Sequence, residues 1–168
     1  MKVWLNVHTP LPKDDTEAHR REVDRTVYVQ KKTEHYKDEI KIGDYAVIYE
    51  VKTDKNNGWV TVDDQPPVPA YEPRGGIVAL VKIATDFRPE PRPGLRKFNG
   101  DYYVGDFTGE CIRKSDDIVI PIVTFTEIDE VFISIHKKHF QPLIFGGIRE
   151  LKPDECRAIE KLLNFRFP

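Results

Sequence analysis

The strongest hydrophobic pattern in the chain is a pair of apolar runs that each begin at glycine. Residues 43–49 and 75–83 carry mostly β-branched and apolar side chains over the length of a strand. At the amino terminus, three apolar residues alternate with Trp4, Asn6 and His8, which is the period of a strand with two unlike faces. We expect the apolar set to enter the core and the aromatic and polar set to point the other way.

Weaker patterns predict the remaining elements. The charged segment 14–26 is expected to form a solvated helix or turn, with a structured loop as the competitor, and residues 33–40 have helical spacing. A last helix begins at Pro153 and places Cys156 and Ile159 on one face. Further strands are expected at residues 27–29, 102–104, 112–113, 118–123 and 132–135. Several short strands followed by a helix predict an α+β fold with a β-barrel core.

Two irregular inserts interrupt this pattern and are therefore candidates for function. Residues 54–73 form a polar segment that carries Trp59 and four prolines. Residues 87–100 carry four basic side chains and one acid among three prolines. The basic residues are Arg88, Arg92, Arg96 and Lys97. They supply the local positive charge that contacts to backbone phosphates need, and the alternative is a loop that is merely solvated.

Composition narrows the class of protein. With 168 residues, the chain is expected to form one domain over residues 1–168 with a full core. A net charge of −2 argues against indiscriminate attachment to nucleic acid, although a local basic patch remains compatible with it. No apolar run approaches the ~20 residues of a membrane-spanning helix. Cys111 and Cys156 make no disulfide framework, so we expect both to be reduced and half-buried in a cytoplasmic protein.

Motifs for catalysis or metal binding are poorly supported. His136 and His139 are three residues apart but lack the further ligands that zinc needs. Adjacent acidic pairs occur at 14–15, 63–64 and 116–117, and such pairs usually meet water. The chain has no nucleophile elbow and no phosphate-binding glycine loop of the Walker type. We therefore expect a protein that is not an enzyme and has no metal and no cofactor.

Aromatic and polar residues are the better candidates for a binding site. Trp4 and Asn6 share a face of the first strand, Tyr45 and Tyr49 share a face of the next, and Trp59 lies in the following loop. Aromatic rings around a flat ligand supply stacking of ~1–3 kcal/mol per base, and an Asn can read the edge of a base. The alternative is that Trp4 and the tyrosines are ordinary core residues, whereas an indole in a polar loop has less reason to be core.

The order of these segments resembles the EVE domain, a member of the PUA-like superfamily that also contains the YTH and ASCH domains. The resemblance covers residues 2–123, and its most specific part pairs residues 43–49 with residues 76–83. It implies a small β-barrel of five or six strands with flanking helices. It also implies a pocket that accepts a single flipped-out base, often a modified one.

The resemblance also implies which residues border that pocket. Trp4 and Asn6 match the first-strand positions beside it, and Tyr49 ends the second strand near it. Trp59 lies where a loop can supply a wall, although the long insert departs from the short link that is usual in the family. Residues 88–97 are expected to contact phosphates without reading sequence.

We therefore expect a reader of a methylated adenine or cytosine, with DNA slightly favoured over RNA. Related domains occur in restriction machinery of the Mcr type, so the chain is expected to be the N-terminal specificity domain of a longer protein that works with a nuclease. The main alternative is a stand-alone PUA-like protein that binds RNA during its modification or processing. Two further alternatives are a small hydrolase that uses His8 and a protein-interaction module.

Overall fold

A computed structural model defines most of the secondary structure of the chain. It describes residues 1–8, 13, 16–50, 59–60, 66, 68–69, 76–91, 97–98, 101–114, 123–124 and 147–168. At positions 17, 59, 60, 97, 98, 101, 114, 123 and 124 it describes the backbone only. Within this part of the chain, no helix is long and apolar enough to cross a membrane.

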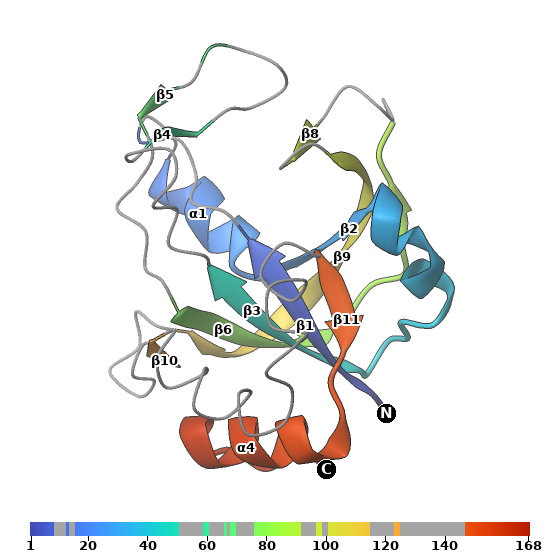
Figure 1. Ribbon diagram of the computed structural model, residues 1–168, viewed down its shortest axis with the longest axis vertical. Coiled ribbons are helices and arrows are strands. Elements are labelled where there is room, and N and C mark those ends of the chain that lie inside the picture. Colours follow the sequence, from blue (N-terminus) through green and yellow to red (C-terminus); the bar gives the residue numbers. More distant parts are fainter. Residues whose placement is uncertain are drawn as a thin grey trace, which may run out of the picture.

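The fold is a nearly closed barrel of six strands in a mixed sheet (Figure 1). Along the sheet the order is β11 (Ile148–Glu150), β1 (Val3–His8), β3 (Tyr45–Glu50), β6 (Gly76–Ile83), β9 (Asp101–Lys114) and β2 (Thr26–Gln30). Only the pairing of β1 with β3 is parallel, and the other four pairings along this path are antiparallel. β2 and β11 therefore end the order on either side of a seam.

Short strands and helices surround the barrel. The short strands are β4 (Trp59–Val60), β5 (Val68–Pro69), β7 (Arg88–Pro89), β8 (Lys97–Phe98) and β10 (Val123–Thr124). β4 pairs with β5, β7 and β8 pair with β9, and β10 pairs with β6. The helices are α1 (Glu17–Val23), the 3-10 helix η1 (Lys31–Asp38) and α4 (Pro153–Leu163).

Both faces of the central strands are buried, because one faces a helix and the other faces the barrel interior. The outer face of β1 and β3 carries the apolar and aromatic residues at positions 3, 5, 7, 45, 47 and 49, which pack against Ile159 and Leu163 of α4. The inner face joins Trp4, Ile48 and Phe107 with residues of β2, β6 and β11. The expectation that the apolar set of β1 enters the core is confirmed, and the opposite set is buried in a second core.

The helix α4 is held to the sheet by a buried ion pair. Arg149 of β11 donates to both carboxylate oxygens of Glu155 at 2.8 and 2.7 Å, and the Lys152 amide donates to the same carboxylate at 2.7 Å. Burial opposes the ionisation of Glu155, but these donors outweigh it and hold its pKa below the ordinary value. The charged side chain is therefore compensated where α4 begins.

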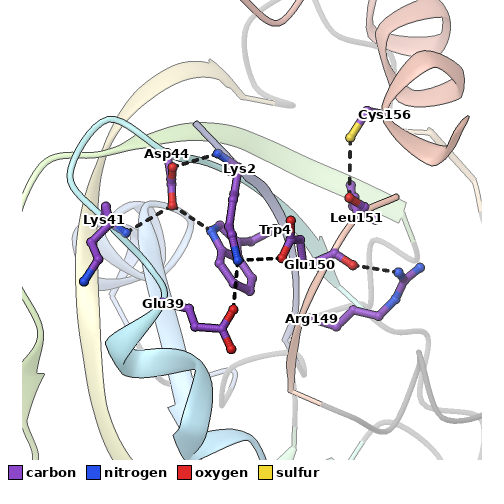
Figure 2. A network of polar contacts seen from close by, with 9 residues as sticks. All are labelled: Lys2, Trp4, Glu39, Lys41, Asp44, Arg149, Glu150, Leu151 and Cys156. Atoms are coloured by element: carbon purple, nitrogen blue, oxygen red, sulfur yellow. Dashed lines mark hydrogen bonds and ion pairs between the residues drawn. The ribbon is translucent and has the colours of Figure 1, made fainter. Parts of the chain in front are cut away.

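Asp44 ties the amino-terminal ends of β1 and β3 together (Figure 2). Its carboxylate accepts the backbone N–H of Lys2 at 2.8 Å, the indole N–H of Trp4 at 3.1 Å and the backbone N–H of Lys41 at 3.1 Å. The preceding Gly43 has a φ of +93°, a conformation that side chains strongly disfavour. Gly43 thus forms the tight turn before β3, and Asp44 after it is the acceptor that β1 and the turn share.

Several sequence predictions are confirmed and others need correction. The strands β2, β3 and β6 and the helices α1 and α4 lie where the patterns predicted them. Residues 33–40 fall largely in a 3-10 helix, and the two strands expected within 102–113 are parts of one strand of 14 residues. The inserts are more regular than expected, because they contain β4, β5, β7 and β8. Cys156 is half-buried as expected, whereas Cys111 is exposed.

Some predicted elements lie outside the described residues. These are the strand at 132–135 and most of the strand at 118–123, whose last residue begins β10.

Replacing Asp44 by Ala should lower the free energy of unfolding by about 2–4 kcal/mol, because a buried indole N–H and two backbone amides lose a charged acceptor. Urea denaturation measures the change. The matched control is Asp38→Ala at an exposed position of η1, which should change stability by about 0.5 kcal/mol or less. Equal, small losses in the two variants would contradict this account of Asp44.

Candidate functional site

The interior of the barrel changes from apolar to polar along β1 and β3. In the parallel register Trp4 pairs with Ala46, Asn6 with Ile48, and His8 with Glu50. Residues paired in this way point to the same face of a sheet. Asn6, His8 and Glu50 are exposed by only 0%, 4% and 5%, so a buried amide, imidazole and carboxylate gather where both strands end. We call these three residues the polar end of the interior.

Asn6 joins β1 to the strand across the seam. Its Nδ2 donates to the carbonyls of Tyr28 at 2.9 Å and Gly147 at 3.1 Å. Its Oδ1 accepts the backbone N–H of Tyr28 at 2.9 Å and lies 2.7 Å from His8 Nε2. All four hydrogen-bonding positions of the amide are thus used within the protein. Because the Asn6 amide bonds to both the N–H and the carbonyl of Tyr28, it makes the hydrogen bonds that a neighbouring strand would make and closes the barrel at this point.

The contacts of Asn6 also fix the ring of His8. Asn6 Nδ2 faces two carbonyl oxygens and Oδ1 faces a backbone N–H, so the orientation of the amide is determined. Oδ1 can only accept, and His8 must therefore donate from Nε2. The ring of His8 packs against that of Tyr28, with centroids 5.0 Å apart.

A row of aromatic residues leads from His8 to the ion pair of Asp106 with Arg88. Tyr28 contacts Tyr103 edge to face, with centroids 5.2 Å apart. The hydroxyl of Tyr103 donates to Asp106, and burial together with this carboxylate raises the pKa of Tyr103. Arg88 donates to the other oxygen of Asp106 from Nε at 2.9 Å and from Nη2 at 2.6 Å. We call His8, Tyr28 and Tyr103 the aromatic row.

A β-bulge brings the aromatic row together. Tyr28 pairs with Asp106 and Gln30 pairs with Tyr103, and the register shifts between Val29 and Gln30. Without the shift, Tyr103 would lie on the other face of β9 from Asp106, because residues three apart in a strand point oppositely. With it, Tyr28, Tyr103 and Asp106 share one face.

The structure separates the pocket residues expected from the sequence. Trp4 and Asn6 share the inner face, but Trp4 is fully buried, with its ring edge to face against Tyr36 at 5.4 Å. Tyr49 lies on the outer face, in the cluster that packs against α4. Tyr45 shares that face with Tyr49, as the sequence predicted.

The insert residues lie around the same end of the barrel as far as they are described. Trp59 pairs through its backbone with Pro69, whose carbonyl accepts the backbone N–H of Lys13 at 2.7 Å. In Figure 1 the arrowheads of β1 and β3 point toward the end of the barrel where α1 and the β4–β5 pair are drawn.

The expected phosphate contacts are described in part. The side chain of Arg88 is 58% exposed while it holds Asp106, and the backbone of Lys97 pairs with Tyr102. Arg92 and Arg96 lie outside the described residues, as do His136 and His139. Among the residues that the structure does describe, no three His, Cys, Asp or Glu side chains come together as metal ligands.

The sequence patterns predict no role in binding for Tyr28, Tyr103 or Glu50. Tyr28 lies between two valines, and this alternation places it opposite the core face of its strand. Local alternation therefore predicts the face on which Tyr28 lies. The contact with Tyr103 depends on the bulge, which no local pattern predicts. The sequence places His8 on the face that it shares with Trp4 and Asn6, and gives it a chemical role only in the hydrolase alternative.

Replacing Asn6 by Asp should lower the free energy of unfolding by about 3 kcal/mol or more, because a buried carboxylate would then face two carbonyl oxygens. Chemical denaturation followed by circular dichroism measures this loss. Asn164→Asp at the exposed end of α4 is the matched control and should cost about 1 kcal/mol or less. If Asn6→Asp is as stable as this control, Asn6 does not close the barrel.

Comparisons with solved structures identify the architecture. Human THYN1, solved in complex with DNA containing 5-methylcytosine, matches over 100% of both chains with a TM-score of 0.56 and 15% identity. Rpa0253 from Rhodopseudomonas palustris matches over 98% of this chain and 94% of its own, with a TM-score of 0.51 and 10% identity. A hypothetical protein from Leishmania major matches over 98% and 95%, with a TM-score of 0.51 and 11% identity.

The sequence itself gives no such match. No model of a protein family matches the chain, and no curated protein matches it either. The likeness to solved structures therefore establishes the fold, which is a PUA-like small β-barrel.

Proposed function

We propose that this chain is a non-enzymatic nucleic-acid reader that takes a single flipped-out, modified base into the polar end of the interior. The observation that carries the proposal is the meeting of the aromatic row with buried hydrogen-bonding groups at His8. A protein of the same fold, THYN1, was solved with DNA that contains 5-methylcytosine. That complex indicates the kind of ligand to test.

Stacking energies make the proposal physically reasonable. Flipping a base out of a duplex costs a few kcal/mol. Each aromatic ring that stacks on a base returns ~1–3 kcal/mol, so rings such as those of Tyr28 and His8 can offset most of this cost. A methyl group adds only ~0.8 kcal/mol of apolar burial. To discriminate a methylated base, the walls of the pocket must therefore be rigid. The hydrogen bonds of Asn6 hold the ring of His8 and the backbone of Tyr28 in place.

The residues named from the sequence have different parts in this proposal. Asn6 acts as a positioning residue, because its own hydrogen-bonding groups are used within the protein. Trp4 forms the buried floor beneath it on the same face of β1. Trp59 supplies a further aromatic wall from the insert. The base lies on the face opposite Tyr49.

The basic residues of the second insert contact the phosphates beside the flipped base. β7 begins at Arg88 and β8 begins at Lys97, and both pair with β9, the strand that carries Tyr103. This pairing keeps both ends of the segment near the aromatic row. Arg92 and Arg96 complete the set. Contacts of this kind set the position of the strand without reading its sequence.

We place this reader on DNA in a defence or restriction setting, in which other domains or a nuclease subunit act on the bound site. A domain with a net charge of −2 should bind weakly and with strong salt dependence when it is isolated. Linkage to a second binding unit raises the overall affinity by avidity.

Fluorescence anisotropy should show tighter binding to one of three modified duplexes, which carry N6-methyladenine, 5-methylcytosine or 5-hydroxymethylcytosine, than to the matched unmodified duplex. Tyr28→Ala should weaken the preferred complex by about 5- to 150-fold, the equivalent of ~1–3 kcal/mol for one stacked base. Tyr102→Ala, an exposed tyrosine on β9, is the matched control and should retain the preference.

Equal weak binding to all four duplexes would overturn the proposal. The same modifications in single-stranded RNA form a further arm, and tighter binding there would assign the reader to RNA.

Arg88→Ala should weaken binding to modified and unmodified duplexes by the same factor and reduce the slope of log K against log salt by about 1. Arg157→Ala is the control, because this arginine is 68% exposed on α4. A change in base preference without a change in salt slope would show that Arg88 acts through Asp106 and not on phosphate.

A further inference from the structure

We infer that Asp106 is a positioning residue, which fixes the direction of Arg88 for contact with a phosphate and joins Arg88 to the aromatic row. This inference rests on the proposed function and adds the side chain that sets the spacing between the base and the phosphate. Asp106 itself touches neither of them.

The sheet places Asp106 between the two parts of the site. It pairs with Tyr28 of β2 on one side of β9 and with Arg88 of β7 on the other. Side chains paired in this way point to the same face of a sheet. At the preceding Gly105, an added Cβ would lie 2.3 Å from the carbonyl oxygen of Arg88. The glycine therefore allows β7 to come this close to β9.

The two oxygens of the Asp106 carboxylate hold different residues. Oδ1 accepts from Nε and Nη2 of Arg88 at 2.9 and 2.6 Å, and Oδ2 accepts from the hydroxyl of Tyr103. Burial and this carboxylate raise the pKa of Tyr103, so its hydroxyl stays protonated and remains a donor. Asp106 therefore cannot turn without breaking a hydrogen bond at one end or the other.

Arg88 has donors that the bonds to Asp106 do not use. Neither of these two bonds involves Nη1, and the side chain of Arg88 is 58% exposed, against 18% for Asp106. The donors of a guanidinium form a rigid fork, so holding Nε and Nη2 also sets the direction of Nη1. An arginine that is already held loses less rotamer freedom when it binds a phosphate.

The alternative is that this cluster only attaches β7 to β9. Ion pairs with a mostly exposed partner contribute little to stability, so variants of Arg88 and of the Tyr103 hydroxyl should remain folded. The two roles differ in binding. If Asp106 positions Arg88, loss of the Tyr103 hydroxyl weakens the phosphate contact, whereas a mere attachment leaves that contact unchanged.

The first test removes the Tyr103 hydroxyl, which carries no charge. Tyr103→Phe should weaken binding to the unmodified duplex by about 3-fold or more and reduce the slope of log K against log salt, because Arg88 loses its fixed direction. In the Arg88→Ala background, Tyr103→Phe should change the affinity by less than about 1.5-fold and leave the slope as it is. Fluorescence anisotropy at several salt concentrations measures both quantities.

The matched control for this test is Tyr102→Phe, which removes a hydroxyl from the exposed neighbouring tyrosine and should change neither quantity. Equal effects of Tyr103→Phe in the two backgrounds would overturn the inference.

The second test compares two variants of Asp106 that have the same charge. Asp106→Asn keeps an acceptor for Arg88 and an NH₂ group that can donate to the Tyr103 hydroxyl, whereas Asp106→Ala keeps neither. Both remove one negative charge, so a difference between them reports on position and not on charge. We expect Asp106→Ala to bind the unmodified duplex at least about 3-fold more weakly than Asp106→Asn. Equal affinities would contradict the inference.

These outcomes separate the inference from the proposed function. Equal binding of the unchanged protein to modified and unmodified duplexes overturns the base reader, even where Tyr103 and Arg88 are coupled. A preference for the modified duplex together with additive effects of Tyr103→Phe and Arg88→Ala overturns only the role of Asp106. Should circular dichroism show that Asp106→Ala does not fold, the test with Tyr103→Phe decides.

Discussion

The Asn6 amide is the interaction on which the site depends. It joins three segments that are far apart in the sequence, because it bonds to Tyr28 on β2, to Gly147 before β11 and to His8 on its own strand. The barrel would otherwise have an open seam at this point. An amide is suited to this position since it offers two donors and two acceptors, which match two carbonyls, one N–H and one ring nitrogen. The same side chain thus closes the barrel and orients His8.

The two ends of β1 differ in their structural role. At the amino-terminal end, Asp44 satisfies the Trp4 indole and two backbone amides, so this end is a closed structural anchor. At the carboxyl-terminal end, His8 and Glu50 bring polar groups into a buried setting beside the aromatic row. Buried polar groups are costly unless they have partners. Their concentration at one end of an otherwise apolar interior favours a binding role there.

The sequence predicted most of the strands and the last helix because these depend on local periodicity. It also predicted a small barrel and the shared face of Trp4 and Asn6. It could not show that Trp4 is held by Asp44, 40 residues away, or that Tyr49 faces α4. It also could not pair Tyr103 with Tyr28, since that contact depends on a bulge in the ladder of β2 and β9. These three contacts require long-range register, which a local pattern does not contain.

Localising the bound base by NMR tests the central claim most directly. Adding a duplex that carries the preferred modified base to isotope-labelled protein should perturb the resonances of His8, Tyr28 and Glu50 most strongly. The unmodified duplex should leave these resonances in place and affect only residues near Arg88. Binding that perturbs the face of α4, or that perturbs His8 and Tyr28 equally with and without the modification, would contradict a base pocket at the polar end of the interior.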